Sequence, residues 1–102
     1  MAGWILQSND ESPRVLRLTP GTSRTVGRAA QADFVCDAPL VSRIHCRLTA
    51  DISGQLVVED LGSTNGTLVN GVAAARGILR SGDTLGVGRV LFSVTDGNPH
   101  EA

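Results

Sequence analysis

The chain has 102 residues, which is enough for one domain with its own hydrophobic core but too few for two such domains. Its 41% hydrophobic and 19% charged residues are ordinary for a globular protein and exclude a disordered chain. The net charge of −1 provides no general attraction to nucleic acid or anionic lipid, so we expect no nucleic-acid or membrane partner and only a local site for any anion.

Short runs of apolar and β-branched residues alternate with turn signals along the chain, and no run has the period of a helix. The predicted strands are, in chain order, 4–7, 14–18, 24–27, 33–36, 45–49, 56–60, 67–70, 77–80, 83–87 and 90–94. The consecutive apolar residues 56–58 predict a strand that is buried on both faces. The one helix-like fragment, 73–77, is too short to form a helix.

Dipeptides that contain glycine separate these strands and supply the positive φ that tight hairpins need. They lie at 53–54, 65–66, 70–71, 81–82 and 96–97. Because no crossover helix can be placed between the strands, the pattern predicts an antiparallel sandwich of two sheets. We expect a single domain over residues 1–97 and a polar tail or linker over 98–102.

The two cysteines, Cys36 and Cys46, lie among strand residues and lack the spacing of metal ligands. We therefore expect buried thiols in a reducing, intracellular setting, with neither a metal nor a cofactor.

Three polar clusters occupy predicted turns: Gly27-Arg28, the run 42–45 (SRIH) and the run 62–67 (GSTNGT). Loops at one end of a sandwich often carry function. Each cluster alone also has a structural explanation, such as a tight turn, a solvated charge or a histidine bonded to backbone. A catalytic interpretation of Ser42 and His45 is weak because no G-x-S-x-G elbow is present, and we expect no enzyme.

Taken together and in this order, the motifs resemble the forkhead-associated (FHA) domain, whose pattern is Gly-Arg, then Ser-x-x-His, then a Ser/Thr-Asn-Gly turn. The runs LVNG at 68–71 and LRSGDTLGVG at 79–88 also look like that family's closing hairpin and penultimate strand. The resemblance covers about residues 4–95. It implies an all-β, FHA-like sandwich of about eleven mainly antiparallel strands in two sheets, whose loops at one end bind phosphothreonine peptides.

The residue chemistry agrees with that function. A phosphothreonine carries close to two negative charges and three acceptor oxygens, so its site needs fixed donors, including a cation. Arg28 has a planar fork suited to phosphate, and Ser42 has a short hydroxyl donor. Arg43 is placed to add a second cation, and by analogy with the family Thr64 contacts the phosphate or the chain beside it. We expect these four residues to bind the phosphate.

Asn65 has an amide that both donates and accepts, so it suits the main chain of a bound peptide. The resemblance makes His45 a structural residue that ties loops together, and Gly66 the residue that supplies the turn; Gly27 supports the site in the same sense. Peptide specificity, which in this family depends on variable loop positions, has three candidates: Leu40, Val41 and Arg89. An apolar Leu40 predicts an apolar ligand residue unless Arg89 comes within range.

Two settings remain open. A tryptophan near the start, followed by such a domain, is similar to DNA-damage-response adaptors such as nibrin, and bacterial signalling proteins with FHA domains fit as well. The first predicts a nuclear protein and the second a cytoplasmic one. We expect a phosphothreonine-containing protein as partner and a monomer or weak self-association. The alternative is a phosphate-independent interaction or self-association module that uses a sheet face.

Overall fold

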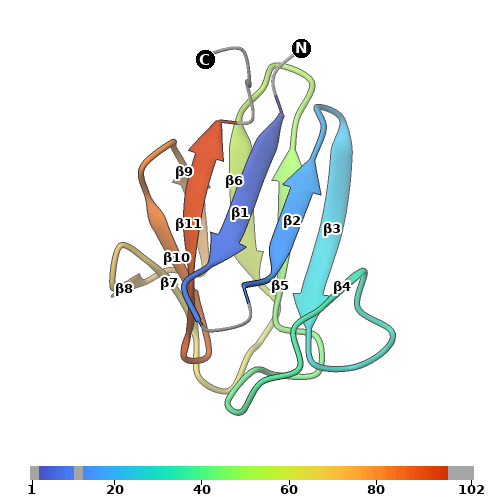
Figure 1. The fold of residues 1–102 in the computed structure, drawn as a ribbon, viewed down its shortest axis with the longest axis vertical. Coiled ribbons are helices and arrows are strands. Elements are labelled where there is room, and N and C mark those ends of the chain that lie inside the picture. Colours follow the sequence, from blue (N-terminus) through green and yellow to red (C-terminus); the bar gives the residue numbers. More distant parts are fainter. Residues whose placement is uncertain (1–2, 11–12, 97–102) are drawn as a thin grey trace.

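The computed structural model describes residues 3–10 and 13–96, which form eleven strands in two sheets, as predicted (Figure 1). The first sheet has, in spatial order, β2 (Val15–Leu18), β1 (Trp4–Ser8), β11 (Val90–Asp96), β10 (Thr84–Val87), β7 (Thr67–Val69) and β8 (Val72–Ala73). The second has β4 (Phe34–Val35), β3 (Thr22–Gly27), β5 (Cys46–Ala50), β6 (Leu56–Asp60) and β9 (Arg76–Leu79). Of the paired strands, only β3 and β4 are parallel. The predicted tail at 98–102 lies outside the described residues.

Every predicted strand overlaps an observed one, but the sequence did not predict β8. This two-residue strand follows a hairpin turn in which Asn70 and Gly71 have φ of 51° and 82°, and Val69 pairs with Val72. Positive φ at both central residues is the mark of a type I′ turn, which the Asn-Gly pair favours. The turn was therefore readable from the sequence, whereas two residues are too few to show a strand period.

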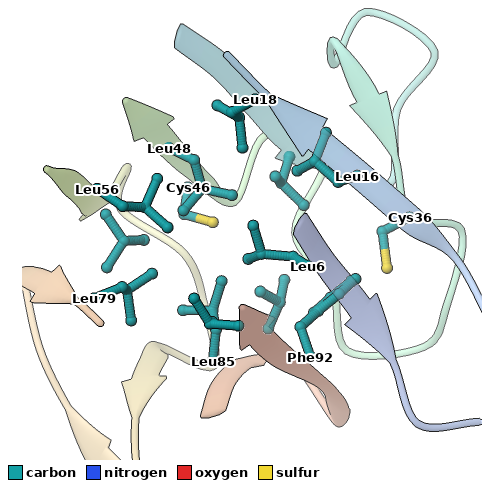
Figure 2. Close-up of a cluster of buried hydrophobic side chains, with 14 of the residues drawn as sticks. Leu6, Leu16, Leu18, Cys36, Cys46, Leu48, Leu56, Leu79, Leu85 and Phe92 are labelled. Carbon is teal, nitrogen blue, oxygen red and sulfur yellow. The ribbon is translucent and has the colours of Figure 1, made fainter. Parts of the chain in front are cut away.

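The core lies between the two sheets and consists of the inward-facing residues of each (Figure 2). Leu6, Leu48, Leu85 and Phe92 are each at most 2% exposed, and burial of such a side chain contributes about 1.5–3 kcal/mol. In β6, residues 56–58 are all buried, as their apolar run predicted. This packed core gives the loops at its ends a rigid base.

Cys36 and Cys46 are free thiols and are fully buried in this core. Burial is the main cause that raises the pKa of Cys46 to about 12, so this thiol stays protonated at neutral pH. Cys46 therefore packs as a small apolar side chain. No membrane-spanning helix is found in the described part of the chain.

The loops that follow β3, β4, β6 and β10 gather at one end of the sandwich, opposite the β5–β6 turn (lower end of Figure 1). Backbone hydrogen bonds join two of these loops, since the N–H of Arg28 donates to the carbonyl of Ser42 at 2.9 Å and that of Ala29 to the carbonyl of Arg43 at 3.1 Å. All three polar clusters found in the sequence lie at this end.

Candidate functional site

Arg28 directly follows β3 and is held in a fixed orientation. Its guanidinium Nε donates a hydrogen bond to the carbonyl of Val41 at 2.9 Å. Among residues 3–10 and 13–96, neither terminal NH₂ group has a hydrogen-bond partner, and no carboxylate oxygen lies within 4.0 Å of this guanidinium. The fork is therefore oriented before any ligand arrives, and its positive charge is unpaired.

Ser42 connects the β4–β5 loop to the β6–β7 loop. Its hydroxyl oxygen accepts a hydrogen bond from the backbone N–H of Thr64 at 2.9 Å. Because this contact uses a lone pair of the oxygen, the hydroxyl proton remains available to a ligand. Thr64 itself is exposed, so its own hydroxyl also faces solvent.

Asn65 is exposed at the tip of the β6–β7 loop and is anchored by one end of its amide. Its Nδ2 donates to the carbonyl of Leu40 at 3.0 Å. The Oδ1 atom and the second N–H proton have no partner within the described residues. An amide held in this way can accept from one peptide group and donate to another.

These side chains line one shallow pocket of about 380 Å³. Its lining residues are Arg28, Pro39, Leu40, Val41, Ser42, Thr64 and Asn65. The lining holds one cation, two hydroxyls and an amide, and it contains no carboxylate. Such a donor set suits a small polyanion.

Arg43 is not part of this pocket, although the sequence predicted it beside Ser42. Its side chain is exposed and does not line the depression. Val41, a predicted specificity residue, lines the pocket with a side chain that is only 2% exposed. Its influence is therefore on the shape of the pocket and, through its carbonyl, on the orientation of Arg28.

His45 is fully buried beneath the pocket and bridges two loops. Its Nδ1 lies 3.0 Å from the N–H of Ser42 and accepts its hydrogen bond. Because Nδ1 accepts, Nε2 carries the ring proton and donates to the carbonyl of Gly66 at 2.8 Å. Both ring nitrogens are occupied by backbone groups, so His45 cannot act as a base for the Ser42 hydroxyl.

Gly27 and Gly66 hold backbone positions that a side chain would disturb. A Cβ atom at Gly27 would overlap the carbonyl oxygen of Arg43, so glycine allows β3 to lie directly against the β4–β5 loop. Gly66 has a φ of 86°, which the turn after Asn65 requires.

Asp60 is a site residue that sequence reasoning missed. Its carboxylate accepts hydrogen bonds from the hydroxyls of Ser63 and Thr67, and from the N–H of Ser63 at 3.0 Å. Burial raises the pKa of Asp60, but these hydrogen bonds outweigh it and hold the pKa below its usual value. Asp60 thereby shapes the loop that carries Thr64 and Asn65. The available signal was an aspartate three residues before a serine, a common turn pattern.

Leu40 has a backbone conformation that the sequence did not predict. Its φ is 71°, in the left-handed region that leucine rarely adopts. Its carbonyl accepts from Asn65, and it lies against Gly88, where an added Cβ would come within 2.7 Å of that same carbonyl oxygen. Contacts from two other loops therefore hold Leu40 in place beside the pocket.

Arg89 lines a second pocket of about 450 Å³ on the other side of Leu40. Its other lining residues are Asn9, Asp10, Ala38, Pro39, Leu40, Val90 and Leu91. The two pockets share Pro39 and Leu40, so Leu40 forms the ridge between them. Asp10 is paired with Arg14 at 2.6 Å, whereas Arg89 has no carboxylate partner in the described ranges.

Comparison with known proteins places this chain in a family. The family model described as FHA domain matches residues 24–88. FhaA of Mycobacterium tuberculosis is 38% identical over 84 residues, which are 81% of this chain and 15% of FhaA. The oxoglutarate dehydrogenase inhibitor of Corynebacterium diphtheriae is 34% identical over 96 residues, which are 94% of this chain and 66% of the inhibitor. The chain thus spans less than two thirds of the length of either relative.

A solved structure from a "structural and functional analysis of phosphothreonine-dependent FHA domain interactions" superimposes with a TM-score of 0.83 and 33% identity. The match covers 91% of this chain and 95% of that one. Both the strand layout and the loop-bearing end are therefore those of a known domain type.

The expected likeness to nibrin, and with it a nuclear setting, finds no support in these matches, because both relatives are bacterial. The tryptophan that suggested it has a structural role here. Trp4 Nε1 donates to the carbonyl of Gly54 at 3.0 Å and ties β1 to the β5–β6 turn. The family match over residues 24–88 shows that this chain belongs to the FHA domain family.

Proposed function

We propose that this domain binds phosphothreonine-containing peptides and proteins through the pocket around Arg28, as an interaction module without catalysis. The observation that carries the proposal is the unpaired guanidinium of Arg28 in a pocket that also holds the Ser42 hydroxyl and contains no carboxylate. The similar structure studied for phosphothreonine-dependent interactions supports the same reading.

The donors match the phosphate in number and charge. Two terminal N–H groups of Arg28 form a bidentate pair with two phosphate oxygens, and the hydroxyls of Ser42 and Thr64 serve the third oxygen. Each hydrogen bond to a charged group contributes about 1.5–3 kcal/mol net, so these contacts dominate the affinity. Arg43, which does not line the pocket, acts in this proposal only as a peripheral cation.

Asn65 holds the peptide main chain beside the phosphothreonine. Its free Oδ1 accepts a peptide N–H, and its second Nδ2 proton donates to a peptide carbonyl. The other Nδ2 proton already donates to the carbonyl oxygen of Leu40, with an N···O distance of 3.0 Å. The amide therefore loses little rotational freedom when the peptide binds.

The second pocket selects a neighbouring ligand residue. Its lining includes Ala38, Val90 and Leu91, which favour an apolar side chain, and it shares Leu40 with the phosphate pocket. Arg89 also lines this pocket and has no carboxylate partner among the described residues, which favours an acidic residue next to the apolar one. Val41 contributes through the shape of the first pocket.

The test is an oriented phosphothreonine peptide library applied to the wild type and to Arg28→Ala. We expect selective binding by the wild type, no detectable binding by Arg28→Ala, and wild-type binding by the control Arg80→Ala, since Arg80 is exposed and lines neither pocket. A matched phosphoserine library tests whether the threonine methyl contributes more than its transfer value of about 0.8 kcal/mol. Intact binding by Arg28→Ala would overturn the proposal.

The alternative from the sequence is phosphate-independent binding or self-association through a sheet face. It predicts equal affinity for phosphorylated and unphosphorylated forms of the same peptide, so the unphosphorylated library separates the two functions. The bacterial relatives favour the interior of a bacterial cell over a nucleus as the setting, and the free thiols Cys36 and Cys46 agree with a reducing compartment.

A further inference from the structure

The first sheet is open along β2. This strand stands at the end of the sheet order and is paired only with β1. The N–H of Ser8 donates to the carbonyl of Arg14 at 2.9 Å, and because such pairs alternate along antiparallel strands, Leu16 also turns its backbone groups toward β1. Val15 and Arg17 therefore turn theirs outward, where no strand of the described chain pairs with them.

A groove of about 390 Å³ lies beside this edge, at the seam between the two sheets (right side of Figure 1). It is lined by Val15, Leu16, Arg17, Arg24, Asp33 and Phe34. Leu16 and Phe34 give it apolar walls that continue into the core. The groove thus offers apolar surface directly next to unpaired strand backbone, and it shares no residue with the two pockets near Arg28.

The charge of the groove is positive. Arg17 and Arg24 are exposed, and no carboxylate of the described residues lies within 4.0 Å of either guanidinium. The Asp33 carboxylate accepts hydrogen bonds from the N–H of Thr25 at 2.9 Å and from its hydroxyl at 3.2 Å. Two arginines against one aspartate leave a net charge of +1, which complements an acidic ligand.

The same charges disfavour a second copy of this chain as the occupant. Antiparallel pairing of two β2 edges would bring Arg17 near Arg17 of the other copy, and like charges across a strand pair are destabilising. Natural sheet edges use such charges against self-pairing. An acidic segment of another protein meets no such repulsion.

We propose that the β2 edge binds an extended protein segment in which apolar and acidic side chains alternate, so that the segment adds a strand to the first sheet. The outward N–H and carbonyl groups of Val15 and Arg17 pair with its main chain. Its apolar side chains enter the groove against Leu16 and Phe34, where Arg24 also lies, and its acidic side chains lie on the opposite face beside Arg17, within the positive field of both arginines. This interaction is independent of phosphate.

The probe is a short, capped, unphosphorylated peptide of alternating valine and glutamate, titrated into ¹⁵N-labelled protein, with the same peptide carrying lysine for glutamate as its control. We expect the amide resonances of Val15 and Arg17 to shift, and their hydrogen exchange to slow, with the glutamate peptide only. The double variant Arg17→Glu, Arg24→Glu should reverse this preference. Arg80→Glu, which reverses one charge elsewhere on the surface, should keep the wild-type preference.

A second variant guards against misfolding of the first. Val15→Pro removes one outward N–H, and an edge strand tolerates proline at such a position, so we expect a folded domain that loses the peptide-induced shifts. Arg28→Ala should bind the glutamate peptide like the wild type, which separates failure at this edge from failure at the phosphate pocket. Absent shifts at β2, or equal shifts with the two peptides, would overturn the proposal.

Discussion

The hydroxyl oxygen of Ser42 accepts a hydrogen bond from the backbone N–H of Thr64 at 2.9 Å, across two loops that are 22 residues apart in sequence. This contact uses a lone pair of the oxygen, so the hydroxyl proton stays available for donation to a ligand. It also brings Thr64 to the pocket that Arg28 lines. One side chain thereby both assembles the site and contributes to it.

Ser42→Ala should remain folded and lose most phosphopeptide affinity. Loss of one charge-assisted hydrogen bond corresponds to roughly a 10- to 150-fold weaker binding, and the unpaired N–H of Thr64 adds a smaller cost to stability. Isothermal titration with a library-selected phosphopeptide measures the effect. Ser23→Ala, an exposed serine on β3 whose side chain contacts Thr49, is the control and should bind like the wild type. Equal affinities for both variants would contradict the role given to Ser42.

Arg28→Lys should bind far less tightly than the wild type even though it keeps the charge. Lysine cannot form the Nε bond that anchors Arg28 to the carbonyl of Val41 at 2.9 Å, and it offers a point charge in place of a planar fork. We expect at least a tenfold loss of affinity and a steeper dependence of binding on salt. Titration at two ionic strengths measures both, and a lysine variant with wild-type affinity would show that charge alone is sufficient.

The order of the motifs predicted which loops meet at the pocket around Arg28, and the alternation of apolar residues predicted the two sheets. The direction of individual side chains in those loops was harder to predict. Arg43 follows Ser42 directly, but the chain bends at residues 43 and 44, so the neighbour of a pocket residue need not enter the pocket. Asp60 was overlooked because its function depends on contacts with Ser63 and Thr67 that exist only in the folded loop.

His45→Ala should lower the free energy of unfolding by about 2–4 kcal/mol. The variant leaves the N–H of Ser42 and the carbonyl of Gly66 without their partner and opens a cavity at a fully buried position. Urea unfolding followed by tryptophan fluorescence measures the change, since Trp4 is the only tryptophan of the chain. An unchanged midpoint would show that water replaces the imidazole at no cost.

Asp60 should make the stability of the domain depend on acid. Its pKa is lower in the folded state than in the unfolded chain, where an aspartate has a pKa of about 3.9. The stabilisation is therefore complete above that pH and is lost as the pH falls through the folded-state pKa. Asp33, Asp51 and Asp83 have lowered pKa values for similar reasons.

Asp60→Asn isolates the contribution of this carboxylate from those of the others. At neutral pH the variant should be less stable than the wild type, because the amide NH₂ faces hydroxyl and N–H groups that already donate to this position. As the pH falls below about 3.9, the unfolded aspartate binds a proton before the folded one does, so the difference should shrink until the folded carboxyl is protonated as well. Urea titrations from pH 7 to pH 3 measure it, and a difference that stays constant over this range would contradict the role of the ionised form.

Leu40→Gly should be more stable than Leu40→Ala by about 1 kcal/mol, because only glycine adopts a φ of 71° without cost. Both substitutions remove the same 44% exposed side chain almost completely, so their difference reports the backbone strain. Val35, also 44% exposed but in β4 with an ordinary strand φ, provides the control pair. There glycine should be less stable than alanine, since it loses more conformational freedom on folding. If alanine is more stable than glycine at both positions, Leu40 is unstrained. If glycine is the more stable variant at position 40 only, the backbone at Leu40 is strained. Weakened selection at the second pocket in both Leu40 variants would then show that the left-handed turn maintains the ridge between the two pockets.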